Sequence, residues 1–366
     1  MKILIIGSRA RTEKYLPELP IVHEADWVVA ERGTSDADLL ALATDADVIF
    51  ADAISPVSAE LIAGMPKLKM IHSEGVAFNA IDCEAARARG IDVCNNKGAN
   101  AVAVAEQTMM LMLGICKFGR VGDIAVRSGR QIEVKEQLMV SGIGEISGST
   151  VGLIGFGDIA REVAKRCRAF GARVLYNKRT PLTAKEDHEL GVSFVTRDEL
   201  LAQSDFVSIH CPVTPMTLGM CDDAFFAKMK DGAYLINTAR GEMVDNEACV
   251  RALESGKLAG AAFDTVAPEP VALENPLLQL KGELADKVLF APHIGGVTSN
   301  MFTRAHRFMW ENAARVAAGE KPLNVVNGEL GRGLRPAAAD AMAWLCAATV
   351  APTSSGAYVG PAARWR

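Results

Sequence analysis

The sequence has no pair of cysteines with the C-x-x-C spacing, although it contains eight cysteines. Zinc sites and disulfide frameworks usually show such regular spacings, so neither is expected, and no metal site is predicted. Several of the cysteines lie within apolar runs that are typical of helices or strands. We therefore interpret them as buried free thiols in a reducing compartment, the cytoplasm: Cys83, Cys94, Cys116, Cys167, Cys211, Cys221, Cys249 and Cys346.

Long apolar runs are also missing. The N-terminal segment MKILIIGSRA has one lysine and a four-residue apolar run before Gly7, which is too short for the core of a signal peptide and is typical of a buried strand. The most hydrophobic segment, 101–116, is interrupted by Glu106 and Gln107, so its unbroken part is too short to span a bilayer. We interpret this segment as a buried helix at a domain or subunit interface.

There is no large excess of charge of either sign. The net charge is -5 at pH 7 and the pI is near 5.8, which gives no electrostatic reason to expect binding to nucleic acid or to an anionic membrane. A small molecule is the expected partner. With 366 residues, of which 49% are hydrophobic, the chain exceeds what one core usually supports, and two domains are expected.

Strand-like and helix-like segments alternate along the chain, and this pattern is typical of βαβ units with a parallel sheet. The first series has predicted strands at 3–6, 48–50, 70–72 and 91–94, with helices at 36–43, 58–64 and 83–89. The second series has predicted strands at 151–154, 174–176, 206–210, 234–237, 260–263 and 288–290. The sequence therefore predicts an α/β fold with two doubly wound parallel sheets.

The predicted domains are not continuous in sequence. We expect residues 1–99 to form the first part of a flavodoxin-like substrate domain, and residues 100–293 to form a Rossmann domain inserted into it. Residues 294–327 complete the substrate domain with a return helix that packs back on it, because apolar residues recur there at helical spacing. The tail, 328–366, is rich in Ala, Gly and Pro and is expected to be mostly loose, with one helix at about 337–350.

A glycine motif follows the first strand of the second series. The segment VGLIGFGDIAREV contains G-x-G-x-x-A at Gly155, Gly157 and Ala160. The first glycine permits a tight strand-to-helix turn, the second lets the main chain approach a pyrophosphate, and the alanine permits close packing of helix and sheet. A glycine-rich turn that binds nothing is the alternative. The strand, the motif and an amphipathic helix follow one another with the spacing of a dinucleotide site. This order favours such a site, in which the phosphates lie at the N-terminus of the helix.

A longer segment resembles a known family. MKDGAYLINTARGEMVDNEACVRALESGKLAGAAFDTVAPEP, followed by VLFAPHIGG, looks like the signature of the D-2-hydroxyacid dehydrogenases, which include phosphoglycerate dehydrogenases and glyoxylate or hydroxypyruvate reductases. The resemblance extends to HCPVTPMT, SEGVAFNAID and NNKGANAVAVAEQT, and covers nearly everything from residue 48 to 327. It implies an NAD(P)-dependent oxidoreductase that transfers a hydride between the cofactor and a small 2-oxo or D-2-hydroxy acid, usually as a homodimer.

The resemblance also implies the roles of single residues. Arg240 of NTARG binds the substrate carboxylate and polarises its carbonyl group, while Glu269 and His293 form the acid/base pair. The main chain of Glu74, Gly75 and Val76 binds the carboxylate from the opposite domain.

The chemistry of the side chains agrees with these roles. Reduction of a ketone develops negative charge on oxygen, so it requires a proton donor and a fixed cation. The planar fork of Arg240 suits a carboxylate, and a carboxylate such as Glu269 stabilises and orients a protonated imidazole. Singly, each residue has an ordinary structural interpretation as a surface ion-pair partner, a loop charge or a loop histidine. Together they follow predicted strand ends of one sheet, where open α/β folds bind ligands.

The resemblance, together with the glycine motif, also implies the cofactor contacts. They are Gly155, Gly157, Asp158, Ile159, Asn177, Lys178, Arg179, Thr180, His210, Cys211, Pro212, Thr217, Thr238, Ala239, Asp264, Gly295 and Gly296. NAD-specific sites place an acid at the end of the second strand of the Rossmann domain. Residues 177–180 have no carboxylate but two cations and a hydroxyl, which suit a 2′-phosphate, so NADP is expected in preference to NAD. An ordinary solvated turn is the alternative.

Two positions depart from the family pattern. The first-domain loop commonly reads G-x-G-x-D-N-I-D, whereas here Gly75 begins GVAFNAID, which leaves the substrate preference open. Thr265 follows Asp264 where the family usually has valine, and we interpret it as a tolerated core change.

Other functions remain as alternatives. One alternative is a non-enzymatic, NAD(P)-sensing regulator with the same fold, since C-terminal-binding corepressors resemble this family. The sequence shows no basic or low-complexity segment that would favour a role in transcription. A formate dehydrogenase is disfavoured because those members typically have glutamine at the position of Glu269. For the expected homodimer, the apolar helix at 101–116 is the expected contact.

Overall fold

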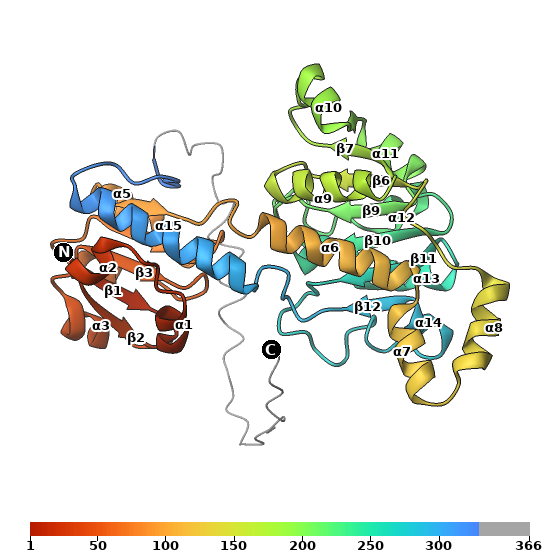
Figure 1. The fold of residues 1–366 in the computed structure, drawn as a ribbon, viewed down its shortest axis with the longest axis horizontal. Helices are drawn as coiled ribbons and strands as arrows, with labels where there is room; N and C mark the ends of the chain where they lie inside the picture. The colour runs from red at the N-terminus through yellow and green to blue at the C-terminus, as the bar shows by residue number, and fades with distance from the viewer. Residues whose placement is uncertain (329–366) are drawn as a thin grey trace. The chain divides into compact units, whose positions relative to one another are not determined.

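The computed structural model describes residues 1–328, so the helix predicted at 337–350 and the tail from residue 329 onwards lie outside the described residues. The described chain contains two parallel sheets with helices on both faces (Figure 1). This arrangement confirms the predicted α/β class.

The first sheet has five parallel strands in the order β2–β1–β3–β4–β5. They are β1 (Lys2–Ile6), β2 (Asp26–Ala30), β3 (Val48–Ala51), β4 (Met70–Ser73) and β5 (Asp92–Cys94). The order is that of flavodoxin-like sheets, as predicted. The helices between these strands are α1 (Arg9–Lys14), α2 (Pro20–Glu24), α3 (Asp36–Ala43), α4 (Ala59–Ala63) and α5 (Cys83–Ala88).

Successive side chains of the central strands point to opposite faces of this sheet. On β1, Leu4 packs in the core under α3, α4 and α5, while Ile3 packs in the core that α2 and a distant helix cover. The strands are therefore buried on both faces and consist of continuous apolar runs, which is the reason that the sequence reveals them.

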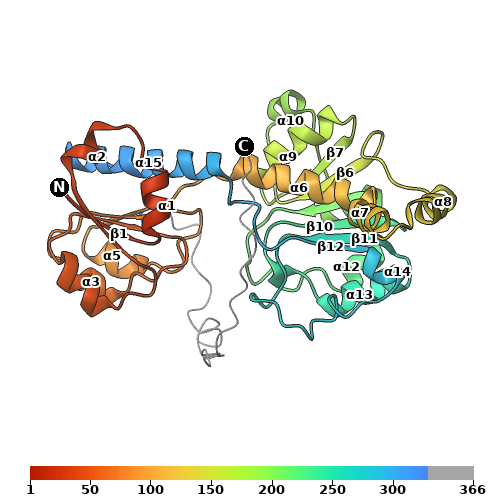
Figure 2. The same cartoon turned by 60° about the horizontal axis from the view of Figure 1, so that its bottom comes forward.

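The distant helix is α15 (Ser299–Ala317), which returns to the first sheet after the second is complete. Its side chains Met309, Trp310 and Ala313 pack with Ile3 and Phe50. Figures 1 and 2 both show α15 running beside α2 along this sheet, and the contacts of α15 with α2 and β4 agree. The return helix predicted within residues 294–327 is confirmed.

The second sheet has seven parallel strands in the order β12–β11–β10–β9–β6–β7–β8, which is the Rossmann arrangement with one further strand. They are β6 (Thr150–Ile154), β7 (Arg173–Asn177), β8 (Ser193–Phe194), β9 (Phe206–Ile209), β10 (Ala233–Asn237), β11 (Leu258–Phe263) and β12 (Val288–Phe290). The helices around it are α9 (Asp158–Ala169), α10 (Ala184–Leu190), α11 (Arg197–Gln203), α12 (Asp223–Lys228), α13 (Asn246–Glu254) and α14 (Glu283–Asp286).

The apolar segment predicted as a buried helix is α6 (Ala101–Cys116), and most of its side chains are buried. It is followed by α7 (Gly119–Arg127) and α8 (Gln131–Ser141), and α8 projects from the second domain in both views. Among residues 1–328, no single helix is long and apolar enough to cross a membrane. Only α6 and α7 together pass that test of length and composition, and they are bent by 60°.

The cysteines in the described part of the chain are all free thiols, as predicted. Their burial was predicted less well. Cys83, at the start of α5, and Cys211, in the loop after β9, are only half-buried. Cys346 lies outside the described residues.

Candidate active site

The predicted site residues of the second domain lie after the carboxyl ends of its parallel strands. The glycine motif follows β6, residues 178–180 follow β7, His210 follows β9, Thr238 follows β10 and Asp264 follows β11. Since parallel strands end at one edge of the sheet, all these segments share that edge. Ligands of open α/β sheets bind at such an edge.

The glycine motif forms the tight turn that the sequence predicts. Gly155 has a φ of +87°, and a Cβ there would lie 2.7 Å from the main-chain nitrogen of Cys211, so only glycine fits. A Cβ at Gly157 would meet no atom within 4 Å, which leaves open space in front of the main chain. No side chain caps α9, whose first turn contains Asp158 and Ile159. Its N–H groups can therefore bind an anion, and the geometry fits a dinucleotide pyrophosphate.

The end of β7 carries the residues expected at the adenosine ribose. Arg179 and Thr180 are exposed and Lys178 is half-buried. Neither cation forms an ion pair with an acidic side chain of residues 1–328, so both can meet a ligand phosphate. Asn177 is already engaged, since its Nδ2 donates a hydrogen bond of 2.9 Å to the carbonyl oxygen of Val195.

The loop after β9 is held by its own hydrogen bonds. The Thr217 hydroxyl donates to the carbonyl oxygen of Pro212 at 2.8 Å and lies 3.0 Å from the Thr214 hydroxyl. His210 Nε2 lies 2.9 Å from the Ser208 hydroxyl, and burial lowers the pKa of His210 to about 3. His210 is therefore neutral at physiological pH, and it can support the turn beside Gly155 without adding charge.

Asp264 organises the turn that carries the predicted acid/base histidine. It is buried, and its carboxylate accepts hydrogen bonds from the main-chain nitrogens of Ile294 at 3.0 Å and Gly295 at 2.8 Å. Gln107 of α6 adds a longer contact of 3.3 Å. A Cβ at Gly295 would lie 2.8 Å from Asp264 Oδ2, so the close approach requires glycine. Gly296 follows, and the position of its Cβ faces Asn100 at the start of α6.

Glu269 and His293 are brought together although they are 24 residues apart. His293 Nδ1 lies 2.6 Å from Glu269 Oε1, and both side chains remain partly exposed, at 39% and 52%. His293 has a φ of +57°, a conformation that is uncommon outside glycine and that the two hydrogen bonds to Asp264 secure. Since the carboxylate accepts from Nδ1, the other ring nitrogen is free to face a substrate.

Arg240 is exposed and lies at the same edge, after β10. Its Nη1 donates to the carbonyl oxygen of Ala239 at 2.7 Å, and no acidic side chain among residues 1–328 pairs with it. The turn before it is fixed by Asn237, whose Oδ1 accepts from Ala239 N and whose Nδ2 donates to the Arg240 carbonyl oxygen. The guanidinium of Arg240 can therefore still donate two parallel hydrogen bonds to a ligand carboxylate.

The predicted substrate loop belongs to the first domain and follows β4. The main chain of Gly75 and Val76 is held by Asn96 N, which donates to the Gly75 carbonyl oxygen at 2.9 Å, and by Asn95 Nδ2, which donates to that of Val76 at 2.7 Å. The N–H of Glu74 donates to the Ala51 carbonyl oxygen at 2.7 Å and that of Gly75 donates to the Ser73 hydroxyl at 3.3 Å, whereas within residues 1–328 the N–H of Val76 has no acceptor. The Glu74 side chain turns away to Arg11 and His306, so only the main chain of this loop can serve a ligand.

Two groups of residues at these sites were not predicted. Gln107 and Thr108 of α6 reach Asp264 and Thr238, and the two threonine hydroxyls lie 3.0 Å apart. Their signal was the polar interruption in the apolar segment 101–116. Arg11 and His306 contact Glu74, and no local pattern marks them. Within residues 1–328 no group of three or more His, Cys, Asp or Glu side chains is placed to hold a metal ion.

Comparison with known proteins identifies the family. Residues 109–295 match the model of the D-isomer specific 2-hydroxyacid dehydrogenase NAD binding domain. The chain is 32% identical over 332 residues to a glyoxylate reductase of Korarchaeum cryptofilum, which covers 90% of this chain and 97% of the relative. It is 36% identical over 301 residues to a D-3-phosphoglycerate dehydrogenase of Archaeoglobus fulgidus, which covers 82% of this chain but only 55% of that longer relative.

A solved structure agrees with these matches. The crystal structure of a glyoxylate reductase from Paecilomyes thermophila superimposes with a TM-score of 0.73 at 29% identity, covering 89% of this chain and 98% of the other. The chain therefore belongs to the D-isomer specific 2-hydroxyacid dehydrogenase family, and its second sheet forms a pyridine-nucleotide-binding Rossmann domain.

Proposed function

We propose that this protein reduces a small 2-oxo acid to the D-2-hydroxy acid, and catalyses the reverse oxidation, with His293 as the general acid/base. The observation that carries the proposal is the 2.6 Å contact between His293 Nδ1 and Glu269 Oε1, at the strand edge that also carries the glycine turn and Arg240. Glyoxylate and hydroxypyruvate are the first substrates to test, since two of the relatives described above are glyoxylate reductases.

In the reduction, the bound nicotinamide cofactor supplies the hydride. The carbonyl oxygen of the substrate becomes an alkoxide, and His293 donates the proton that neutralises it. The carboxylate of Glu269 holds the ring through Nδ1, so the proton on Nε2 points to the substrate, and its negative charge stabilises the imidazolium before transfer. In the oxidation the neutral ring accepts the same proton.

Arg240 holds the other end of the reacting group. Its guanidinium binds the substrate carboxylate with two parallel hydrogen bonds and places positive charge beside the developing alkoxide. The N–H of Val76 binds the same carboxylate from the substrate domain, and the N–H of Gly75 joins it by exchanging its long hydrogen bond to the Ser73 hydroxyl. A ketone without a carboxylate gains neither interaction, and this accounts for selection of 2-oxo acids.

For the cofactor we propose NADP in preference to NAD. Lys178 and Arg179 stand where an acid would bind a ribose diol, and neither is paired with an acidic side chain of residues 1–328. The other proposed contacts are those of the glycine turn, of residues 210–212 and 217, of Thr238 and Ala239, and of Asp264, Gly295 and Gly296. Asp264 contributes to the cofactor site mainly because its carboxylate fixes the turn of Ile294 and Gly295.

A turnover assay tests this function. NADPH and NADH are each mixed with a panel of 2-oxo acids that includes glyoxylate, hydroxypyruvate and phosphohydroxypyruvate, with acetone as the control lacking a carboxylate. We expect turnover with at least one 2-oxo acid and none with acetone. Cofactor binding without turnover on any acid would contradict the enzyme and favour the regulatory alternative, which none of the relatives described above supports.

We also propose that the protein is a cytoplasmic homodimer. Exposed apolar side chains support an interface: Met110 of α6 is 45% exposed and Phe170 after α9 is 45% exposed. Val140 of the projecting helix α8 is 90% exposed. Exposed apolar surface of this kind marks contacts between chains. Sedimentation of the wild-type protein and of Met110→Glu measures the oligomeric state directly.

A further inference from the structure

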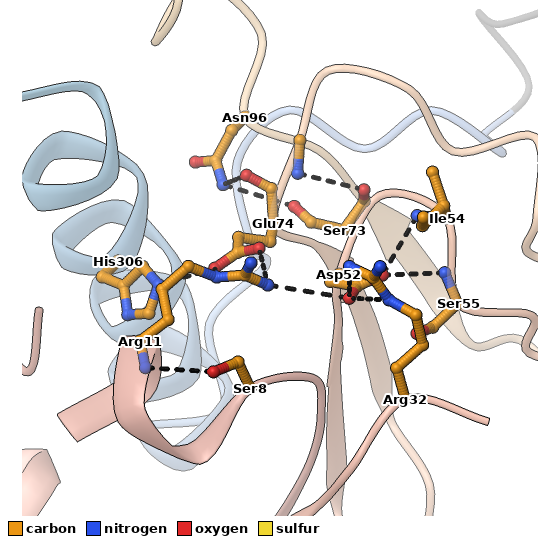
Figure 3. A network of polar contacts seen from close by, with 11 residues as sticks. Ser8, Arg11, Arg32, Asp52, Ile54, Ser55, Ser73, Glu74, Asn96 and His306 are labelled. Carbon is orange, nitrogen blue, oxygen red and sulfur yellow. Dashed lines mark hydrogen bonds and ion pairs between the residues drawn. The ribbon is translucent and has the colours of Figure 1, made fainter. Parts of the chain in front are cut away.

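A cluster of charges around the buried Asp52 joins two loops of the substrate domain (Figure 3). Arg11 extends from α1 between Asp52, which follows β3, and Glu74, which follows β4. Its Nε and Nη2 lie 2.9 and 2.7 Å from the two carboxylate oxygens of Glu74, and the same Nη2 lies 3.6 Å from Asp52 Oδ2. One guanidinium therefore contacts both carboxylates.

Asp52 determines the shape of the first loop. Its side chain is 3% exposed, and its Oδ1 accepts hydrogen bonds from the main-chain nitrogens of Ile54 at 3.2 Å and Ser55 at 2.9 Å. Arg32 holds Oδ2 at 2.6 Å. Burial raises the pKa of Asp52, but the hydrogen bonds from Arg32 and the loop outweigh it and keep the pKa below its usual value. The loop 52–55 is thus wrapped around one ionised carboxylate.

Glu74 determines the start of the second loop. Besides Arg11, its Oε1 meets His306 Nε2 of α15 at 2.8 Å, while its carbonyl oxygen accepts from Asn96 Nδ2 at 2.9 Å. Every polar group of this residue is engaged, since its N–H donates to the Ala51 carbonyl oxygen at 2.7 Å. The peptide that leads into Gly75 therefore has no freedom to turn.

The two loops touch each other beside the proposed carboxylate site. A Cβ at Gly75 would lie 2.6 Å from the Cβ of Ala53, so the main chain of the second loop lies directly against the first. Ile54 and Val76 are 66% and 37% exposed on these two loops. A shift of either loop moves both the N–H groups of 75–76 and the apolar side chains next to them.

We propose that Arg11 is a positioning residue that determines recognition of the 2-oxo acid without touching it. It fixes the loops 52–55 and 74–77 against each other through Asp52 and Glu74, and so presents the N–H groups of Gly75 and Val76 at the distance that the carboxylate requires. The inference rests on the proposed function of those N–H groups. The two carboxylates are balanced by Arg11 and Arg32, so the cluster needs no bound anion to be stable.

The variant Arg11→Met tests the role. It keeps the apolar stem but removes the fork, and we expect the KM for the best 2-oxo acid to rise by about tenfold or more, because small misplacements of binding groups are costly. The kcat and the KM for the cofactor should change little. Arg11→Lys should recover only part of the loss, since an ammonium cannot make the same three contacts. Arg9→Met is the matched control, because exposed Arg9 on the same helix pairs only with Glu13 among acidic side chains of residues 1–328.

Hydrogen exchange of the main chain provides a readout that does not depend on activity. In Arg11→Met the hydrogen-bonded amides of the two loops, those of Asp52, Ile54, Ser55 and Glu74, should exchange faster, while those of β4 and of the second domain stay protected. If the single variant is too unstable, Arg11→Met with Glu74→Gln removes the unbalanced charge and should regain stability but not the KM. Wild-type KM in either variant, or unchanged exchange in both loops, overturns the proposal. A wild-type protein that reduces no 2-oxo acid would refute the proposed function, whereas the exchange comparison would still decide the positioning role.

Discussion

Replacement of Arg179 by alanine should shift the cofactor preference from NADPH towards NADH. Arg179 lies directly after the end of β7, is exposed and has no acidic partner among residues 1–328. A cation in this place can pair with a 2′-phosphate, which NADPH has and NADH lacks. The variant removes that contact and leaves the glycine turn of Gly155 and Gly157 untouched.

The exposure of Arg179 limits the size of the effect. A charge-assisted hydrogen bond contributes roughly 1.5 to 3 kcal/mol where it is shielded, but solvent screening at an exposed site reduces this to about 1 kcal/mol. A loss of about 1 kcal/mol corresponds to about fivefold in affinity. We therefore expect the KM for NADPH to rise about fivefold while the KM for NADH stays unchanged.

Steady-state kinetics at a saturating concentration of one 2-oxo acid measures the KM for NADPH and for NADH. Arg173→Ala is the matched control, because exposed Arg173 lies at the amino end of the same strand, away from the site edge. The wild-type protein is measured first, and a kcat/KM for NADH equal to or above that for NADPH would refute the NADP proposal. An equal loss with both cofactors in Arg179→Ala would mean that the arginine acts on the fold or on the shared part of the cofactor.

Asn177→Asp also tests the cofactor preference, but it changes a structural hydrogen bond at the same time. The Asn177 Nδ2 donates to the carbonyl oxygen of Val195, so aspartate would lose this hydrogen bond and place two acceptors together. The variant would lose stability at the end of β7 as well as change the cofactor preference. The structure thus favours Arg179 as the position to vary.

Four further predictions follow from the site and the core. His293→Ala should lower kcat by roughly 10²- to 10⁴-fold, with cofactor binding by fluorescence titration nearly unchanged; near-normal turnover would remove His293 from the mechanism. Glu269→Gln, which replaces the carboxylate that contacts His293 Nδ1 by an amide, should lower kcat for reduction while cofactor binding stays nearly unchanged, and a wild-type kcat would exclude the carboxylate from the mechanism. Arg240→Lys should lose most discrimination between 2-oxo acids and simple ketones, and full activity in it would contradict the bidentate geometry. Burial lowers the pKa of His72 to about 4, whereas the unfolded chain takes up this proton near 6.5, so the free energy of unfolding should fall on acidification between these values. In urea titrations His72→Leu should flatten that slope by about 1.4 kcal/mol per pH unit, and an identical slope would show that another group is responsible.

The strands that run through the core were predictable because they are continuous apolar runs. The edge strand β2 was not predicted, since it begins with Asp26, its Trp27 is only half-buried and it pairs with one neighbour only. The two-residue strand β8 has both side chains exposed and leaves no hydrophobic pattern. Strands with one partner and little burial depend on tertiary context.

The proposed acid/base pair was predictable because the segments that contain Glu269 and His293 resemble a family signature, and the structure places the two side chains 2.6 Å apart. The partners of Glu74 were not predictable, because His306 lies 232 residues away and Arg11 belongs to a short helix that has no strong pattern. The hydrogen bonds of the Asp264 side chain could not be predicted from the sequence either. A motif indicates that the residue belongs to the site, but the hydrogen bonds to the turn of Ile294 and Gly295 depend on the path of the main chain.

The late position of α15 also affects how the protein can be made. One face of the first sheet is covered by Met309, Trp310 and Ala313, which leave the ribosome after the whole second domain. Until then Ile3 and Phe50 have only α2 to pack against on that side. The nucleotide domain can therefore fold first on the nascent chain, and the domain that is synthesised first is completed last. During this interval the apolar face of the first sheet stays partly exposed.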